Sequence, residues 1–381
     1  MNKRVCSTIL LLFITLVSIN SFAVPVIIPA APEINAKSYV LIDYNSGKVI
    51  ASKNPDEKLP PASLTKIMTA YIAASEIAAG HIHLDDMVTV SEKAWKMEGS
   101  RMFIEVNSKV SVRDLLKGIV IQSGNDASVA MAEHISGDES VFAQVMNQTA
   151  KRLGMKNSHF MNATGLPHPD HYTTANDLAI LARALIHDFP DEYKIHAQKE
   201  FVYNNIKQQN RNRLLWLDDT VDGIKTGHTD AAGYCLVTSA LRDGMRLIAV
   251  VMGTDSDKAR TVANQTLLNY GFRYFETHKL YSSNDNVTSV KVWKGQQDSV
   301  NLGLQKDLYV TTARGKFDSL TKDFSIPEPV LAPLKQDQQL GELTVKEGDK
   351  QILKTPLYAK QTIAAGGLFK RTADRIRLIF E

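Results

Sequence analysis

Residues 60–79 read PPASLTKIMTAYIAASEIAA, and this stretch carries the clearest structural signal in the chain. Two prolines stand just ahead of an alanine-rich segment, which is a common way for a helix to begin. The large apolar side chains then recur at helical spacing. They are Ile67, Met68, Tyr71, Ile72 and Ile77. The pattern predicts a largely buried helix that begins near Ser63.

Strand patterns lie on both sides of this helix. Residues 39–42 and 49–51 flank a turn at Asn45-Ser46-Gly47 and predict a β-hairpin, and further strands are predicted near Gly223, at 234–238 and at 247–252. Between them, apolar spacing predicts helices at 112–121, 127–135, 141–153 and 174–186. Strands at both ends with helices between them predict an α/β sandwich over residues 34–278, whose sheet joins the two ends of the domain.

A second, smaller domain is predicted after a polar, loop-like cluster at residues 282–286. Beyond this cluster, short alternating runs occur at 287–293, 308–312 and 340–345, between glycines and prolines. Runs of this kind predict a small all-β domain over residues 285–357.

The N-terminus has the pattern of a secretory signal peptide over residues 1–23. Lys3 and Arg4 precede an apolar run at 9–17, and small residues precede a predicted cleavage after Ala23. A retained anchor is the alternative, although the run is shorter than the roughly 20 residues of a membrane span. Cleavage leaves 42 basic against 41 acidic residues, a net charge of +1, which argues against a nucleic-acid partner.

The segment Ser63-Leu64-Thr65-Lys66 pairs a hydroxyl with an amine, because residues three apart share one face of a helix. A neutral Lys66 amine can take the proton of the Ser63 hydroxyl, which needs a pKa lowered by burial or by a second cation such as Lys225. The same tetrapeptide recurs at Ser319-Leu320-Thr321-Lys322, between acidic residues in the β-rich region. We interpret that second copy as a solvated loop.

Two further motifs follow. Ser123-Gly124-Asn125 lies between two predicted helices, where a tight turn can aim a proton-relaying hydroxyl and an amide into one cleft. Lys225-Thr226-Gly227-His228 precedes a strand pair, and its ammonium and hydroxyl groups suit a substrate carboxylate. Each motif alone is an ordinary turn or loop. Their order, with separations of roughly 60 and 100 residues, is nearly the set of penicillin-binding proteins and class A β-lactamases, in which Ser-Asp-Asn is the middle motif.

With these motifs, the chain resembles the low-molecular-mass penicillin-binding proteins of the serine D-alanyl-D-alanine carboxypeptidase type, the peptidase S11-like branch. The resemblance extends over nearly the whole mature chain. It implies an antiparallel sheet with a helical cluster, of the penicillin-binding and serine β-lactamase type. It also implies cleavage of the terminal D-alanine from peptidoglycan stem pentapeptides, covalent binding of β-lactams and no cofactor.

The resemblance also implies roles for single residues. Ser63 is acylated, Lys66 is the base and Ser123 assists it. Asn125 holds a substrate carbonyl or the lysine, and Lys225 with Thr226 recognises the terminal carboxylate. The backbone N–H groups of Ser63 and His228 form the oxyanion hole. Arg260 helps to orient the carboxylate.

Three other functions remain as alternatives. A β-lactamase needs a water-activating glutamate with asparagine three residues later, and none of the glutamates between the second and third motifs has one. A metal site at His168-Pro169-Asp170-His171 would lie on a turn, rather than on the helix face that paired histidine ligands prefer. A non-catalytic wall-binding or scaffold protein would not need all three motifs.

The C-terminal residues 362–381 predict an amphipathic helix. On a helical projection Leu368, Phe369, Ile376, Ile379 and Phe380 fall on one side. The charged residues lie opposite and are mostly basic. Such a helix binds a lipid interface with anionic headgroups, and a helix docked on the protein is the alternative. Together with the signal peptide, it predicts a periplasmic protein attached to the inner membrane.

Overall fold

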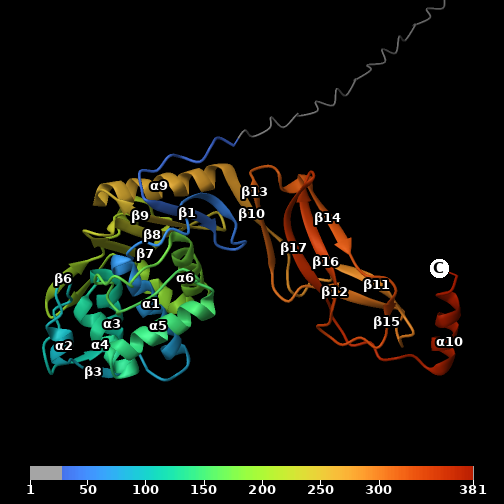
Figure 1. The fold of residues 1–381 in the computed structure, drawn as a ribbon, viewed down its shortest axis with the longest axis horizontal. Helices are drawn as coiled ribbons and strands as arrows, with labels where there is room; N and C mark the ends of the chain where they lie inside the picture. Colours follow the sequence, from blue (N-terminus) through green and yellow to red (C-terminus); the bar gives the residue numbers. More distant parts are fainter. Residues whose placement is uncertain (1–27, 381) are drawn as a thin grey trace, which may run out of the picture.

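The structure, a computed structural model, describes residues 28–380. Figure 1 shows two parts, a sheet covered by helices and an elongated β-rich part, with the last helix at the far end of the β-rich part. The predicted signal peptide at 1–23 lies outside the described residues.

A five-stranded antiparallel sheet with the order β2-β1-β9-β8-β7 forms the centre of the first part. Its strands are β1 (Ser38–Asp43), β2 (Val49–Lys53), β7 (Val221–Thr229), β8 (Gly233–Arg242) and β9 (Met245–Thr254). Strand β1 pairs with β9, with Ser38 opposite Met252 and Asp43 opposite Leu247. The predicted sheet that joins the N- and C-terminal ends of the domain is therefore confirmed.

Helices cover both faces of this sheet (Figure 1). On one face, α9 (Asp257–Tyr274) buries Leu267 and Leu268 against the strands. The other face carries α6 (Ala175–Asp188), α1 (Lys66–Ala78) and a large core. The remaining helices of this part are α2 (Glu92–Trp95), α3 (Val112–Lys117), α4 (Asn125–Ser136), α5 (Glu139–Leu153), α7 (Pro190–Tyr193) and α8 (Leu214–Leu217).

Two helices depart from the regular form at positions that matter for the site. The helix predicted near Ser63 opens with a 3₁₀ turn, η1 (Ala62–Thr65), and α1 follows it. The helix predicted at 112–121 ends as α3 at Lys117 and continues as a π-helical turn, η2 (Gly118–Gln122). A second 3₁₀ turn, η3 (Lys194–Ala197), precedes the small hairpin of β5 (Glu200–Tyr203) and β6 (Ile206–Gln209).

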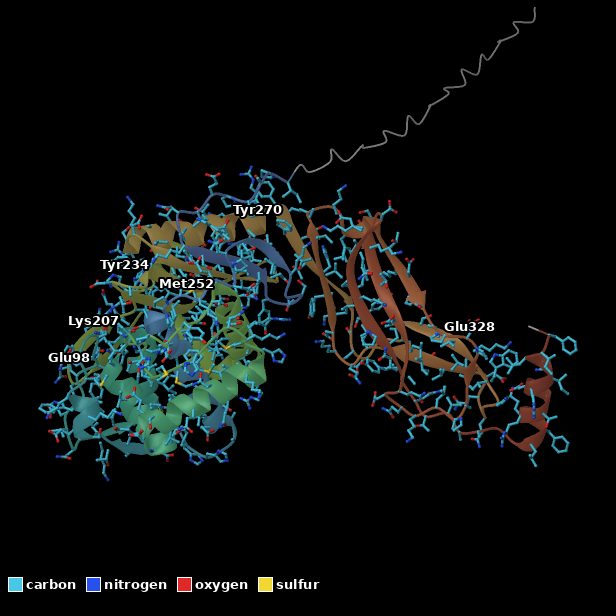
Figure 2. All side chains as sticks on the ribbon, viewed as in Figure 1. Glu98, Lys207, Tyr234, Met252, Tyr270 and Glu328 are labelled. Atoms are coloured by element: carbon cyan, nitrogen blue, oxygen red, sulfur yellow. The ribbon has the colours of Figure 1, made fainter. Side chains whose placement is uncertain are left out.

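Helix α9 and the two short strand pairs are not predicted by the sequence. Arg260, Thr261 and Asn264 lie on the buried side of α9, so the apolar pattern is interrupted in the first half of the helix. Strands β3 (Met87–Thr89) and β4 (Lys109–Ser111) form the other short pair. The hairpin β5–β6 packs beside the loop after Glu98, because Gln208 donates to the Met102 carbonyl at 3.0 Å. Figure 2 shows Glu98 and Lys207 on this same side of the molecule.

The β-rich part begins with β10 (Phe275–Tyr281), which pairs with β13 (Leu308–Ala313). A six-stranded sheet follows with the order β14-β16-β17-β12-β11-β15. Its strands are β11 (Thr288–Trp293), β12 (Ser299–Gly303), β14 (Leu320–Ser325), β15 (Val330–Leu331), β16 (Gln339–Glu347) and β17 (Lys350–Ala359). The short 3₁₀ turn η4 (Phe317–Ser319) precedes β14. Strand β10 thus crosses residue 278, where the sequence ends the first domain, and β17 runs two residues past 357.

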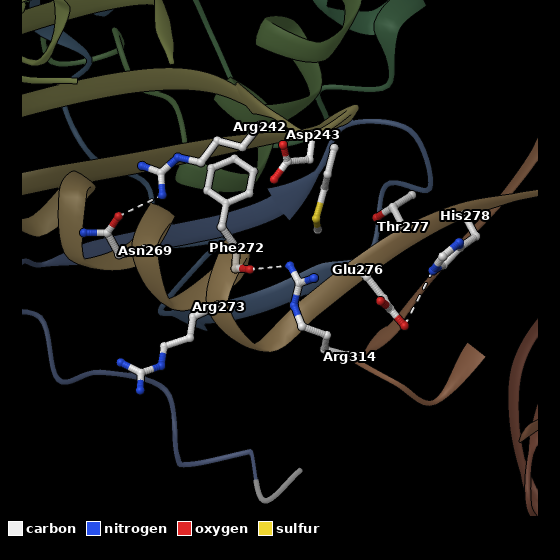
Figure 3. Close-up of a pocket in the computed structure, with 10 residues that line it drawn as sticks. Arg242, Asp243, Asn269, Phe272, Arg273, Glu276, Thr277, His278 and Arg314 are labelled. Carbon is white, nitrogen blue, oxygen red and sulfur yellow. Dashed lines mark hydrogen bonds and ion pairs between the residues drawn. The ribbon is translucent and has the colours of Figure 1, made fainter. Parts of the chain in front are cut away.

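Polar contacts join the two parts. The buried Asp43 accepts a hydrogen bond from Thr277 at 2.7 Å, and Lys48 donates to the Thr311 carbonyl at 2.9 Å. A cavity of about 530 Å³ lies where α9 meets β10. There Arg314 donates to the carbonyl of Phe272, as Figure 3 shows. No residue of the three motifs lines this cavity.

Helix α10 (Leu368–Arg377) is held to the β-rich part by its polar side. The buried Asp374 accepts a hydrogen bond from the Lys294 backbone at 2.7 Å, and Lys370 pairs with Asp298. The apolar side chains point outward, with Phe369 95% and Phe380 85% exposed. Among residues 28–380, every helix is too short or too polar to cross a bilayer.

Candidate active site

The predicted nucleophile and base lie together at the start of α1. Ser63 belongs to η1 and is partly exposed, whereas Lys66 is 1% exposed as the first residue of α1. The Lys66 Nζ and the Ser63 Oγ are 3.1 Å apart. This is within the hydrogen-bond reach that a base needs to take a proton from a hydroxyl.

Lys66 is held by two further acceptors, the Asn125 Oδ1 at 2.7 Å and the Thr164 carbonyl at 2.6 Å. Burial, and after it the charge of the nearby cation Arg211, lowers the pKa of Lys66 to about 7 against the opposing effect of Asp126. A lysine with a pKa near neutrality is partly uncharged at neutral pH. It can therefore accept the Ser63 proton.

The second motif faces the third. Ser123 ends η2 in the left-handed conformation, with φ of 65°, and its Oγ accepts a hydrogen bond from Lys225 at 3.0 Å. Asn125 begins α4, and its amide also donates to the Glu98 carbonyl at 2.6 Å. The turn therefore links the Lys66 amine on one side, through Asn125, to the Lys225 amine on the other side.

Lys225 lies on β7, the edge strand of the sheet, and is 3% exposed. Burial holds the pKa of Lys225 well below its ordinary value, and the charges of Lys66, Arg211 and Arg260 lower it further. A bound carboxylate favours the charged form of a neighbouring amine. Lys225 is thus suited both to exchange a proton with the Ser123 hydroxyl and to hold an anionic substrate group.

The rest of the third motif packs against the nucleophile. A Cβ on Gly227 would lie 3.1 Å from the Pro61 carbonyl oxygen and 3.2 Å from the Leu64 backbone nitrogen. A side chain here would therefore push the Ser63 turn away from β7 by a few tenths of an ångström. Thr226 is buried, while His228 is exposed with its ring 4.0 Å from that of Tyr234.

Arg260 lies behind the third motif, on α9. Its guanidinium donates to the carbonyls of Gly227 at 2.9 Å and Cys235 at 3.2 Å, and it pairs with Asp257 at 2.5 Å. These bonds use most of its donors. Arg260 thus supports the strand that carries Lys225, and its predicted part in orienting the carboxylate stays a prediction.

The sequence does not single out three groups that shape the site. Arg211 donates to the Ser100 hydroxyl at 2.8 Å, and it is the cation that lowers the pKa of Lys66, where Lys225 was expected. Asp126, 1% exposed, accepts hydrogen bonds from the Met102 and Phe103 backbones at 3.0 and 2.9 Å, and so fixes the loop at residues 102–103 beside the second motif. The third group is the Thr164 carbonyl, which any residue type supplies.

Other sequence candidates lie elsewhere. Ser319 ends η4 far along the chain and is exposed, with its hydroxyl bonded to the Lys316 carbonyl at 2.7 Å. His168 is exposed, whereas His171 is buried beside Thr65. Within residues 28–380, no group of three or more side chains is placed to hold a metal ion.

Comparison with known proteins shows the family of the chain. The profile of a family described as D-alanyl-D-alanine carboxypeptidase matches residues 26–256, and the profile of the penicillin-binding protein 5 C-terminal domain matches residues 275–365. The chain belongs to the D-alanyl-D-alanine carboxypeptidase family. Members of this family are hydrolases, and the chain is a serine-type D-alanyl-D-alanine carboxypeptidase. The predicted fold class and enzyme class are thereby confirmed.

Individual relatives in this carboxypeptidase family match most of the chain. The D-alanyl-D-alanine carboxypeptidase DacC of Escherichia coli is 44% identical over 92% of this chain and 90% of its own length. The structure of penicillin binding protein 5 from Haemophilus influenzae is 42% identical, with a TM-score of 0.86, over 88% of this chain and 99% of that one. Penicillin-binding protein D2 of Listeria monocytogenes, solved in its ampicillin-bound form, is 28% identical with a TM-score of 0.59 over 63% of this chain and all of that one.

Proposed function

We propose that this carboxypeptidase removes the terminal D-alanine from peptidoglycan stem pentapeptides through an acyl-enzyme at Ser63. The observation that carries the proposal is the Lys66 amine, which is buried, has a pKa lowered to about 7 and lies 3.1 Å from the Ser63 oxygen. The neighbouring motifs supply the other groups that acyl transfer needs: proton donors, and polar contacts for the substrate.

The proposed reaction has two halves. The Ser63 oxygen attacks the carbonyl carbon of the penultimate D-alanine, and Lys66 takes the Ser63 proton. The peptide C–N bond then breaks, and the leaving amine receives a proton through Ser123 and Lys225, so free D-alanine departs. In the second half, water attacks the Ser63 ester and passes one proton through Ser123 back to Lys225. Lys66 returns its proton to the Ser63 oxygen, and the shortened peptide leaves with a carboxylic acid end.

Charged and polar groups of the site recognise the substrate. Lys225 and Thr226 receive the terminal carboxylate, Asn125 holds a backbone carbonyl of the substrate, and the N–H groups of Ser63 and His228 stabilise the oxyanion. A β-lactam offers a carboxylate and a reactive amide carbonyl of similar spacing, so it acylates the same serine. The ampicillin-bound Listeria relative supports this part of the proposal.

The direct test is mass spectrometry of the full chain incubated with a pentapeptide that ends in two D-alanines. We expect loss of one D-alanine from the peptide and a covalent adduct on the Ser63 peptide after addition of penicillin. An adduct on another residue contradicts the role of Ser63, and an intact pentapeptide contradicts the substrate.

We further propose that the mature protein is periplasmic and lies on the inner membrane through α10. The support is the orientation of the helix. Its polar side binds the β-rich part through Asp374 and Lys370, while Leu368 (80% exposed) and Phe369 (95% exposed) face away from the protein. Basic side chains beside such an apolar strip favour anionic headgroups.

Two variants test this attachment in a sedimentation assay with vesicles that contain anionic phospholipid. Truncation after Gly366, and the substitution pair Phe369→Ser with Ile376→Ser, should both leave the protein in the supernatant. Penicillin labelling should be unchanged in both. Normal sedimentation of the truncated chain contradicts the attachment.

A further inference from the structure

Residues 159–173, which we call the supporting segment, pass beneath the turn that carries Ser63. At one end of the contact, Leu59 and Thr173 exchange backbone hydrogen bonds of 2.8 and 3.0 Å. Further along, the Thr69 hydroxyl donates to the Ala163 carbonyl at 2.8 Å. The segment is thus fixed to the chain both before and after the nucleophile.

The turn itself needs outside support. Ala62, directly before Ser63, has φ of +47°, a conformation that side chains other than glycine rarely adopt and that persists only where neighbours impose it. The turn is also a short 3₁₀ helix without a side-chain cap, and 3₁₀ hydrogen bonds have poor geometry. Contacts from outside the turn therefore contribute to fixing the position of Ser63.

The supporting segment contacts this turn directly at two positions. Gly165, with φ of +86°, approaches so closely that a Cβ there would lie 1.8 Å from the Ala62 carbonyl oxygen and 2.9 Å from the Thr65 hydroxyl. The second contact is made by His171, whose Nε2 shares a hydrogen bond of 3.0 Å with the same Thr65 hydroxyl. Both contacts converge on the turn between Ala62 and Thr65.

His171 is well suited to a fixed contact of this kind. It is 3% exposed, and its ring packs edge-on against Phe160, with the ring centroids 5.7 Å apart. Its Nδ1 is buried and has no hydrogen-bond partner. Among the described residues, the ring therefore makes its hydrogen bond to Thr65 alone. Burial lowers the pKa of His171 to about 4, followed by the charges of His159 and His168, so the ring is neutral near pH 7.

We propose that His171 is a positioning residue for acyl transfer: through Thr65 it fixes the strained turn and thereby the distance between the Ser63 oxygen and the Lys66 amine. Thr65 connects the two, since it is fully buried and stands between Ser63 and Lys66 in the chain. A misplaced nucleophile slows the chemical step more than it weakens binding, because binding uses groups on the other side of the cleft. The inference rests on the proposed roles of Ser63 and Lys66.

The test is stopped-flow acylation of the full-length protein by a fluorescent penicillin, which separates the acylation rate constant from the non-covalent dissociation constant. His171→Leu should lower the rate constant by about tenfold or more and change the dissociation constant by less than about twofold. Thr65→Val should have the same effect. The double variant should be no slower than either single one, because both remove one bond. His171→Gln, whose amide can still bond Thr65, should recover most of the rate.

Two matched variants separate positioning from general stability. His168→Leu changes an exposed histidine of the same segment and should match the wild type. Asn147→Ala removes two hydrogen bonds of 2.8 Å to the Phe160 backbone, on the same segment but away from the turn. It should lower Tm and leave the acylation rate constant unchanged.

Three results would overturn the inference: a His171→Leu protein that loses Tm like Asn147→Ala but keeps its acylation rate constant, a His171→Gln protein as slow as His171→Leu, or additive losses from His171 and Thr65. If His171→Leu does not fold, Thr65→Val and His171→Gln still decide the question. Failure of the proposed function is seen separately, as labelling that survives Ser63→Ala.

Discussion

The chain contains the tetrapeptide Ser-Leu-Thr-Lys twice, at residues 63–66 and 319–322, and the two copies have different structures. The first forms η1 and the start of α1, and its last three residues are buried. The second ends η4 and enters β14, at the edge of the six-stranded sheet, where three of its four residues are exposed. Identical residues therefore take a helical conformation in one place and an extended one in the other.

The polar contacts differ as much as the backbone does. Lys66 contacts the serine of its own copy and two acceptors from distant segments, whereas Lys322 lies over the Tyr281 ring at 5.0 Å. Ser319 bonds a neighbouring carbonyl instead of its lysine. The reactivity expected of Ser63 therefore depends on burial and on residues outside the tetrapeptide. Matched substitutions in the two copies can test this conclusion.

The serine pair gives the largest expected difference. Ser63→Ala should abolish covalent labelling by fluorescent penicillin and release of D-alanine, because the attacking oxygen is gone. Ser319→Ala should label and turn over like the wild type. Gel fluorescence and a D-alanine assay measure both, and residual labelling of Ser63→Ala would place the nucleophile elsewhere.

The lysine pair gives the second largest expected difference. Lys66→Gln should slow acylation by about 10²- to 10⁴-fold, the usual contribution of a general base. Lys322→Gln should leave the rate unchanged, since its ammonium is exposed and remote from its serine. Equal acylation rates for Lys66→Gln and the wild type would contradict the role of Lys66 as the general base.

The leucine pair tests packing. Leu64 is fully buried in the main core, so Leu64→Ala should lower the free energy of unfolding by about 2–5 kcal/mol. Leu320 is only partly buried against the core of the β-rich part, so Leu320→Ala should cost about 1 kcal/mol or less. Denaturant unfolding, followed separately for each part, measures the two losses. A larger loss for Leu320→Ala would contradict the assigned burial.

The smallest expected effect is on the pH dependence of the acylation rate, which should depend on the first copy and not on the second. Because Lys66 must be neutral to accept a proton and has a pKa of about 7, acylation should rise about tenfold between pH 5.5 and 6.5 and level off above pH 8. Lys322→Gln should keep this profile. Arg211→Gln should move the midpoint to higher pH, since it removes a cation that lowers the pKa of Lys66. A flat profile would contradict a neutral lysine base.

Sequence reasoning recovered the elements with a clear apolar repeat and the residues with distinctive chemistry. It predicted the helix after Ser63, the sheet that closes on β1, and three motifs that come together in one cleft. It missed α9, because Arg260 and Asn264 occupy positions on its buried side. The motifs were found from their order and spacing along the chain, because each motif alone is an ordinary turn or loop.

The remaining errors have physical causes too. Arg211 lies in an ordinary polar loop, and only the folded chain brings it near Lys66. The close approach of Gly227 to the Ser63 turn is not predicted either, because it arises only when β7 packs on that turn. The π-helical turn that sets the left-handed Ser123 has no signal in the sequence. Contacts between distant segments decide all three features.

The bond between Lys225 and Ser123 joins the sheet to the helical cluster across 102 residues of sequence. A fluorescent penicillin therefore acts as a conformational probe as well as an activity label, because labelling requires contact between the sheet and the helical cluster. Partial unfolding of the β-rich part should leave labelling intact, whereas separation of the sheet from the helical cluster should abolish it. This makes the antibiotic a reporter of folding.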